Sequence, residues 1–215
     1  MLRLSLFILL LTPLSSAAPQ ELRLSSMFAD HMVLQRETSA PVWGWASPGT
    51  EIRVLGSWSE SAATCKADGK GAWRVDLATP IAGGPHTLTV TADKSITLQD
   101  VMVGEVWICS GQSNMEWHLS WFADGAVTAN TVDEPQLRLC TVAKTFSDAA
   151  KSESNISWDL CTPKSVADFS ATGFYFGREL ADALPGVPIG LVLTAWGGTV
   201  VEAWTSEAAL RLGGE

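Results

Sequence analysis

The sequence predicts an antiparallel β-sandwich over residues 19–103, followed by an α/β domain over residues 104–215. Before Val103, apolar and polar residues alternate along short segments, and turns rich in glycine or proline separate these segments. After Val103, apolar segments of strand length alternate with segments of helical periodicity. Period-two alternation indicates strands with one buried face, whereas the order strand–helix–strand indicates a parallel sheet. We therefore place a domain boundary near Val103.

The first domain is expected to contain six to eight short strands. Each expected strand has an apolar residue at every second position, which is typical of a strand with one face on a core. The clearest examples are residues 51–55, 72–77, 86–90 and 95–98. Glycine and proline supply the positive or fixed φ angles of the turns, at residues 47–49, 68–71 and 83–85. This spacing of strands and turns is typical of an antiparallel sandwich.

The second domain is expected to contain three strands that are covered on both faces. Their apolar runs are uninterrupted, which is typical of strands inside a parallel sheet. These runs are residues 106–109, 137–142 and 189–193.

Two helices and one long loop are expected between and after these strands. Asp168 is expected to cap the first helix, whose apolar residues share one face and which a Pro-Gly pair ends at residue 185. The second helix is expected over residues 206–212, with Thr205 as its cap. Residues 143–165 are polar and irregular, which predicts a long loop of the kind found near functional sites.

Residues 1–18 have the composition of a secretory signal peptide. Arg3 precedes an apolar run over residues 4–14, and small residues follow it at 15–18. An uncleaved membrane anchor is the alternative. The formal net charge is −9, without clusters of lysine and arginine, so we expect no binding to nucleic acid or, after cleavage, to membranes. These features predict a secreted or periplasmic protein, or a lysosomal or extracellular one in a eukaryotic host.

Four cysteines remain for disulfide bonds in an oxidising compartment. They allow three complete pairings, among which the sequence does not choose. Cys140 with Cys161 is one candidate bridge, whereas Cys109 lies in an apolar run and is expected to be a small buried residue. No close spacing of cysteine and histidine suggests a zinc site, and we expect neither a metal nor an organic cofactor.

The residues that are most informative about chemistry follow the first apolar run. A serine, Ser113, comes directly after a turn at Gly111, and glycine permits both a sharp turn and close approach of a substrate. Loops at the carboxyl ends of parallel strands are where α/β proteins place ligands. A serine there can act as a nucleophile beside backbone N–H groups that stabilise an oxyanion. The alternative is a capping box, because Glu116 follows Ser113 at the required spacing.

A family resemblance favours the catalytic interpretation. Residues 104–117 read Gly-Glu-Val-Trp-Ile-Cys-Ser-Gly-Gln-Ser-Asn-Met-Glu-Trp and closely resemble the nucleophile block of the sialate O-acetylesterase family, a branch of the SGNH hydrolases. Four further blocks, in order along nearly all of the mature chain, resemble the same family: residues 27–36, 41–46, 176–180 and 188–206. The resemblance implies a flavodoxin-like three-layer α/β domain, here incomplete, after an N-terminal β domain.

The resemblance also implies roles for individual residues. Ser113 would be the nucleophile, and its backbone N–H would be one donor of the oxyanion hole. The second donor would come from the glycine loop after residues 189–193, where we favour Gly198 over Gly197. Side chains that are expected to hold the nucleophile turn or shape the pocket are Gln112, Asn114 and Glu202. The chain departs from the family at Thr194, where Asn or Ser is expected, and at Val200, where Pro is common.

The expected general base is missing from these 215 residues. In the family, this histidine and its aspartate lie near the C-terminus of a longer chain, so the resemblance predicts the N-terminal portion of a longer enzyme. None of His31, His86 and His118 is expected to replace it, since a base must reach the serine oxygen. We therefore expect little or no esterase activity from this chain alone.

The function expected is a secreted carbohydrate esterase that hydrolyses O-acetyl esters of sugars through a serine nucleophile. The expected partner is an O-acetylated sugar or polysaccharide. The sequence does not distinguish sialic acid from acetylated xylan as the substrate, and it does not predict the oligomeric state. One alternative is a carbohydrate-binding β-sandwich module that stacks sugars on exposed aromatic rings. Its candidate residues are Trp43, Trp45, Trp58 and Trp73. A further alternative is an inactive truncated fragment.

Overall fold

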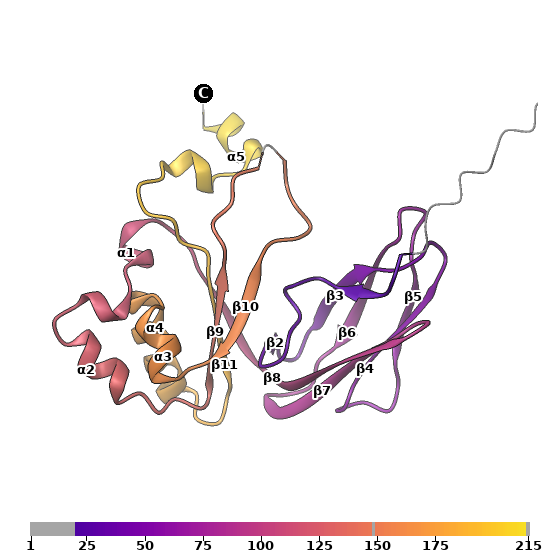
Figure 1. Cartoon of the computed structure of the whole chain (residues 1–215), viewed down its shortest axis with the longest axis horizontal. Helices are drawn as coiled ribbons and strands as arrows, with labels where there is room; N and C mark the ends of the chain where they lie inside the picture. The colour runs from indigo at the N-terminus through magenta and orange to yellow at the C-terminus, as the bar shows by residue number, and fades with distance from the viewer. Residues whose placement is uncertain (1–19, 148, 214–215) are drawn as a thin grey trace, which may run out of the picture.

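The structure is a computed structural model that describes residues 20–147 and 149–213 (Figure 1). The signal peptide predicted at residues 1–18 lies outside the described residues. Among the described helices, none is both long and apolar enough to cross a bilayer.

The strands form two sheets. A three-stranded antiparallel sheet has the order β1-β3-β6, and an eight-stranded sheet has the order β10-β9-β11-β8-β7-β4-β5, with β2 paired to β8. The strands of the first half are β1 Arg23–Leu24, β2 Val33–Gln35, β3 Ser39–Trp45, β4 Glu51–Gly56, β5 Ala63–Lys66, β6 Ala72–Ala78 and β7 Gly83–Thr91. The others are β8 Ser95–Cys109, β9 Leu137–Val142, β10 Ile156–Leu160 and β11 Ile189–Leu193.

The helices all follow β8 in the chain. They are α1 Ser113–Glu116, α2 Gly125–Asn130, α3 Pro163–Ala167, α4 Ala171–Ala183 and α5 Glu207–Leu212. Two short 3-10 helices, η1 Leu119–Trp121 and η2 Val201–Trp204, complete the described elements.

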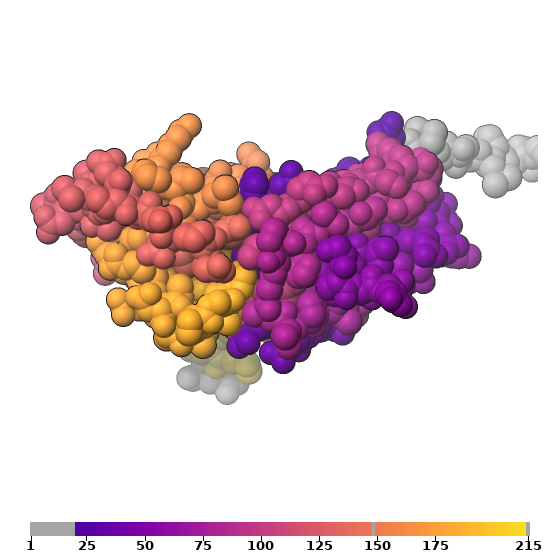
Figure 2. Space-filling model, turned by 90° about the horizontal axis from the view of Figure 1, so that it is seen from below, coloured from indigo at the N-terminus to yellow at the C-terminus, as the bar shows by residue number. Residues whose placement is uncertain are grey.

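Strand β8 connects the two halves of the molecule. Its first part pairs antiparallel with β7, and residues 105–109 pair parallel with β11. Figure 1 shows β8 passing from the N-terminal strands to the sheet that carries the helices. The two halves lie side by side along a broad contact in Figure 2. The boundary that we place near Val103 therefore falls within one continuous strand.

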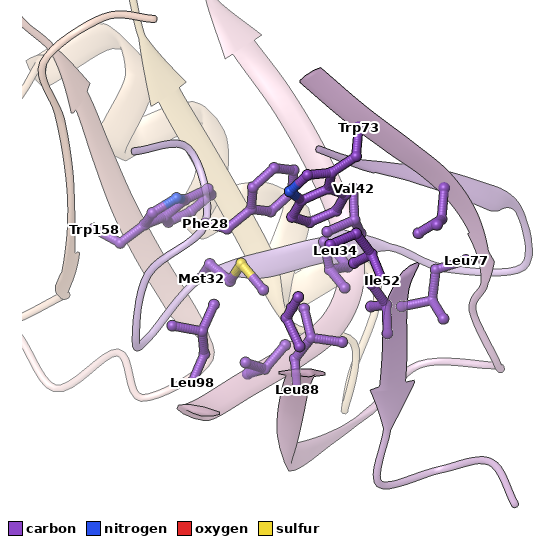
Figure 3. Close-up of a cluster of buried hydrophobic side chains, with 14 of the residues drawn as sticks. Phe28, Met32, Leu34, Val42, Ile52, Trp73, Leu77, Leu88, Leu98 and Trp158 are labelled. Atoms are coloured by element: carbon purple, nitrogen blue, oxygen red, sulfur yellow. The ribbon is translucent and has the colours of Figure 1, made fainter. Parts of the chain in front are cut away.

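The N-terminal core is built from both sheets. The four strands predicted by alternation lie within β4, β6, β7 and β8, and their apolar positions point inward, as in Val54 and Val75. Figure 3 shows this cluster, in which Val42 and Trp73 from the small sheet lie near Ile52 and Leu88 from the large one. Burial of apolar area on this scale is the main favourable term in folding.

The two faces of the parallel strands have different covers. One face, with Cys140 and Val192, joins the N-terminal core, and Trp158 of β10 donates from its indole Nε1 to the Met27 carbonyl at 2.9 Å. The other face, with Leu191, packs against helix α4, where Gly177 allows close approach. Among the described residues, helices thus cover one face of β9 and β11 and N-terminal strands cover the other, whereas Trp107 and Ile108 of β8 are exposed.

An ion-paired cluster lies where the N-terminal half meets β9. The Asp100 carboxylate contacts His31 Nδ1 at 2.7 Å and the Arg138 guanidinium at 3.3 Å. The Arg138 side chain is almost fully buried. The His31 side chain thus makes a structural hydrogen bond with Asp100.

The predicted strands after residue 104 are confirmed, but residues 106–109 are not covered on both faces, because Trp107 and Ile108 are exposed. Several other local predictions are also wrong. The segment predicted as a loop at 143–165 contains β10 and α3, so only its first part is irregular. Ser170, not Asp168, caps α4, since its side chain accepts the Gly173 N–H at 2.9 Å. Ser206, not Thr205, caps α5.

The predicted Cys140–Cys161 bridge is absent, and all four cysteines are free thiols. The two thiols lie in different cores, on opposite faces of the sheet. Cys140 points into the N-terminal core. Cys161 instead joins the core beneath α3 and α4. Burial raises the pKa of each thiol to about 12, because the thiolate loses its hydration.

The cap of α4 gives a stability test. The Ser170→Ala variant loses an acceptor for a buried N–H, so the free energy of unfolding should fall by about 1 kcal/mol. Urea denaturation measures the loss. Ser120→Ala is the control, because Ser120 lies in η1 and its hydroxyl bonds to no residue that the structure describes. Equal midpoints for the two variants would show that Ser170 is not the cap.

Candidate active site

Three parallel strands end at one edge of the sheet. In the register of the sheet, Leu193 of β11 lies beside Cys109 of β8 on one side and Thr141 of β9 on the other. The segments that follow these strands, residues 110–114, 194–199 and 143–146, therefore meet at this edge. This is where open α/β sheets bind ligands.

The predicted nucleophile Ser113 is the first residue of α1. Gly111 makes the turn before it with a φ of +143°, a conformation that side chains rarely permit. Ser113 is half-buried, and neither its hydroxyl nor its backbone N–H bonds to a residue within 20–147 or 149–213. Both groups are thus free to meet a substrate.

The capping-box alternative for Ser113 does not hold. Gln112 occupies the N-cap of α1, and its side chain accepts no backbone N–H of the helix. The Glu116 side chain, which a capping box would turn back to the cap, instead accepts the N–H of Gly197. The local sequence therefore builds an open turn around Ser113.

The loop after β11 is attached to this turn through backbone hydrogen bonds. The Thr194 N–H donates to the Cys109 carbonyl at 3.0 Å, and the Trp196 N–H donates to the Gly111 carbonyl at 2.9 Å. Gly197 follows next to Ser113, since a Cβ at position 197 would lie 3.4 Å from the Ser113 Oγ. The structure thus brings together the two segments that the sequence predicts to form the site.

The two glycines of this loop differ in their hydrogen bonding. The Gly197 N–H is engaged by Glu116. Gly198 is exposed, has a φ of +76°, and its N–H donates to no acceptor in the part of the chain that the structure describes. An unengaged N–H is what an oxyanion donor requires, and Gly198 remains the predicted donor.

The other predicted pocket residues have mixed positions. Gln112 and Asn114 line a depression of about 490 Å³ with Ser113 and Thr172. Their side chains do not hold the nucleophile turn as expected, since they make no hydrogen bond to it among the described residues, although the Asn114 carbonyl accepts the Thr172 hydroxyl at 2.8 Å. Glu202 is exposed on η2 and lines neither this depression nor a second one on the other side of the glycine loop.

A second depression, of about 450 Å³, lies on the other side of the glycine loop. Its wall includes Phe146, whose ring centroid is 4.7 Å from that of Trp196. Trp204 closes the loop by donating from Nε1 to the Thr199 hydroxyl at 2.7 Å. The depression thus presents aromatic side chains beside the candidate oxyanion donor.

The structure adds Lys144 and gives Glu116 a new role. Lys144, two residues after β9, forms an ion pair with the Glu116 carboxylate. The position of Lys144 in the sequence was a signal that could have identified it, because residues directly after a predicted parallel strand lie at this edge of the sheet. The pairing itself joins residues far apart in sequence and is visible only in the fold.

No histidine in the described chain bonds to Ser113. His31 pairs with Asp100, and His86 lies 3.4 Å from the Ser57 hydroxyl. His118 stacks on Trp121 with a centroid distance of 4.4 Å, and its Nδ1 faces Asp168 at 3.8 Å. Among the described residues, the site thus has a hydroxyl and N–H donors, and none of these three side chains is bonded to that hydroxyl.

Comparisons with known proteins agree with this geometry. Residues 103–211 match the family model described as carbohydrate esterase, sialic acid-specific acetylesterase. Mouse sialate O-acetylesterase is 30% identical over 95% of this chain, and the human enzyme is 31% identical over 88%. A solved carbohydrate acetylesterase from Xanthomonas citri is 40% identical over 90% of this chain, with a TM-score of 0.83.

The chain is shorter than these relatives. It spans 41% of the mouse enzyme, 40% of the human enzyme and 44% of the Xanthomonas citri chain. The family match nevertheless covers half of the chain and includes both segments that meet at Ser113. The chain therefore belongs to the family of sialic acid-specific carbohydrate acetylesterases.

Proposed function

We propose that this chain carries the nucleophile and the oxyanion hole of a secreted esterase that removes acetyl groups from sugars. One observation supports the proposal most strongly: Ser113 begins α1 after β8, beside the Gly197–Gly198 loop, and its hydroxyl bonds to no residue that the structure describes. Residues 19–103 would form a β-sandwich domain that supports this site. Secretion rests on the composition of residues 1–18.

The reaction would proceed by acyl transfer. The Ser113 Oγ attacks the acetyl carbonyl carbon as its proton passes to a base, and the N–H groups of Ser113 and Gly198 stabilise the oxyanion. The C–O bond to the sugar then breaks, and the sugar oxygen takes a proton. Water attacks the acetyl-serine and releases acetate. The base is a group other than the three histidines of this chain.

The substrate would be an O-acetylated sugar, in keeping with the names of the relatives. The sequence and the depressions beside Ser113 favour neither sialic acid nor acetylated xylan. The rival interpretation as a sugar-binding sandwich finds little support, because its tryptophans are engaged elsewhere. Trp73 is buried, Trp43 packs edge-on against Phe28, and Trp45 lies beneath the Arg23 guanidinium.

Acetate release tests the proposal directly. The chain is incubated with O-acetylated sialic acid or acetylated xylan in imidazole buffer, because free imidazole can serve as the missing base. We expect acetate release that depends on imidazole and on Ser113, and little or none in phosphate buffer. Release at the same rate by the Ser113→Ala variant, or none from the folded chain with either substrate, would contradict the proposal.

A further inference from the structure

We propose that Glu116 and Lys144 form a charge-balanced clamp that positions the Gly197–Gly198 loop against Ser113. Both are positioning residues, since they act through the loop rather than on the substrate. This inference rests on the proposed function and goes beyond it, because it assigns roles to two side chains outside the nucleophile and the oxyanion donors.

The clamp joins the segments that follow three different strands. Glu116 lies in α1, after β8, and one of its carboxylate oxygens accepts the Gly197 N–H from the loop after β11. Its other oxygen pairs with the Lys144 ammonium, from the segment after β9. The Glu116 side chain thus connects all three segments at the edge of the sheet where Ser113 lies.

The hydrogen bond to Glu116 assigns different tasks to the two glycines. A carboxylate is a strong acceptor, so the Gly197 N–H is held in place and turned away from a bound carbonyl. The next N–H along the chain, that of Gly198, has no acceptor among residues 20–147 and 149–213. The clamp therefore fixes the loop through Gly197 and leaves Gly198 to donate.

Lys144 has an electrostatic task. The Glu116 side chain is 19% exposed, so water screens its negative charge only in part. An unpaired carboxylate three residues from the nucleophile would oppose the negative charge that develops on the acetyl oxygen. The Lys144 ammonium cancels that charge, and it also lies 5.9 Å from the Trp196 ring centroid.

A merely structural ion pair would behave differently from this clamp. If the pair only held segments together, losing both partners would be at least as harmful as losing one. If charge balance matters, Lys144→Met should harm the reaction because it leaves Glu116 unpaired. Adding Glu116→Gln should then rescue it, since glutamine keeps an acceptor for the Gly197 N–H without the charge.

Two measurements on the full chain test the clamp. The first is hydrogen exchange of the Gly197 amide, followed by NMR. The second is the rate at which a p-nitrophenyl phosphonate labels Ser113 in imidazole buffer, followed by mass spectrometry. The matched controls are Lys151→Met and Glu179→Gln, which remove exposed charges away from the clamp.

We expect Glu116→Ala to speed exchange of the Gly197 amide about tenfold or more, since it loses its acceptor. Lys144→Met should slow phosphonate labelling about tenfold, and the double variant Lys144→Met with Glu116→Gln should return within about threefold of the wild type. Both controls should match the wild type.

Unchanged exchange in Glu116→Ala, or a double variant as slow as Lys144→Met, would overturn the clamp. If Ser113 is not labelled in the wild type, the proposed function fails instead. The exchange rate of the Gly197 amide in Glu116→Ala still tests whether the clamp exists in that case, because hydrogen exchange does not depend on the esterase reaction.

Discussion

The Ser113→Ala variant should lose acetate release almost completely while it keeps its stability. With free imidazole as the base, we expect a fall of about 10²-fold. This is less than the loss in a complete serine hydrolase, where a positioned base adds its own factor. The Ser113 hydroxyl bonds to no described residue, so the free energy of unfolding should change by less than about 0.5 kcal/mol.

This pair of readouts separates a nucleophile from a helix cap. Acetate release and urea denaturation are measured on Ser113→Ala, with Ser170→Ala as the comparison, because Ser170 does cap a helix. A cap lost at Ser113 would cost about 1 kcal/mol and leave the chemistry intact. That pattern of stability loss with retained activity would remove Ser113 from the mechanism.

Gly197→Ala should have the next largest effect on the reaction. Its methyl group would overlap the Glu116 carboxylate and lie 3.4 Å from the Ser113 Oγ, so the loop must shift. A displacement of about 1 Å in a catalytic group can cost about 10²-fold, and we expect a loss of this order in phosphonate labelling of Ser113.

The control for this substitution is Gly69→Ala. A Cβ at position 69 meets no atom within 4 Å, and Gly69 does not have the positive φ that would strain alanine. The rate of labelling should therefore stay at the wild-type value. A Gly197→Ala variant that labels as fast as Gly69→Ala would show that the glycine loop does not bear on Ser113.

The sequence predicted the elements that position the site. Residues 137–142 and 189–193 are strands with the predicted bounds, because uninterrupted apolar runs have few alternatives in a parallel sheet. Ser113 lies where the turn at Gly111 predicts it. Its hydroxyl bonds to no described residue, and the Glu116 side chain turns to Gly197 instead of back to the start of the helix. The local sequence does not determine that orientation.

Local patterns were insufficient where two residues could serve the same purpose. Asp168 and Ser170 can both cap a helix, and the choice follows from α3, which ends at Ala167 and makes Asp168 its own C-terminal cap. Strand β10 was missed because the polar residues before it conceal its short alternation, in which Ile156 and Trp158 share one face. In both cases the outcome depends on a neighbouring element, which is α3 for the cap of α4 and β9 for strand β10.

The site partners that the sequence missed are long-range pairs. The Lys144–Glu116 ion pair and the contact between Phe146 and Trp196 both depend on the order of the strands in the sheet. The strand order places β11 between β9 and β8, which brings the ends of all three together. No periodicity in the sequence encodes that order.

The central claim is that Ser113 faces backbone N–H groups able to hold an oxyanion. A crystal structure of the chain with a phosphonate bonded to the Ser113 Oγ tests this most directly, because the phosphonyl oxygen takes the place of the oxyanion. We predict this oxygen within about 2.7–3.1 Å of the backbone nitrogens of Ser113 and Gly198, with Gly197 still bonded to Glu116. A phosphonyl oxygen that faces solvent, away from both N–H groups, would contradict the account.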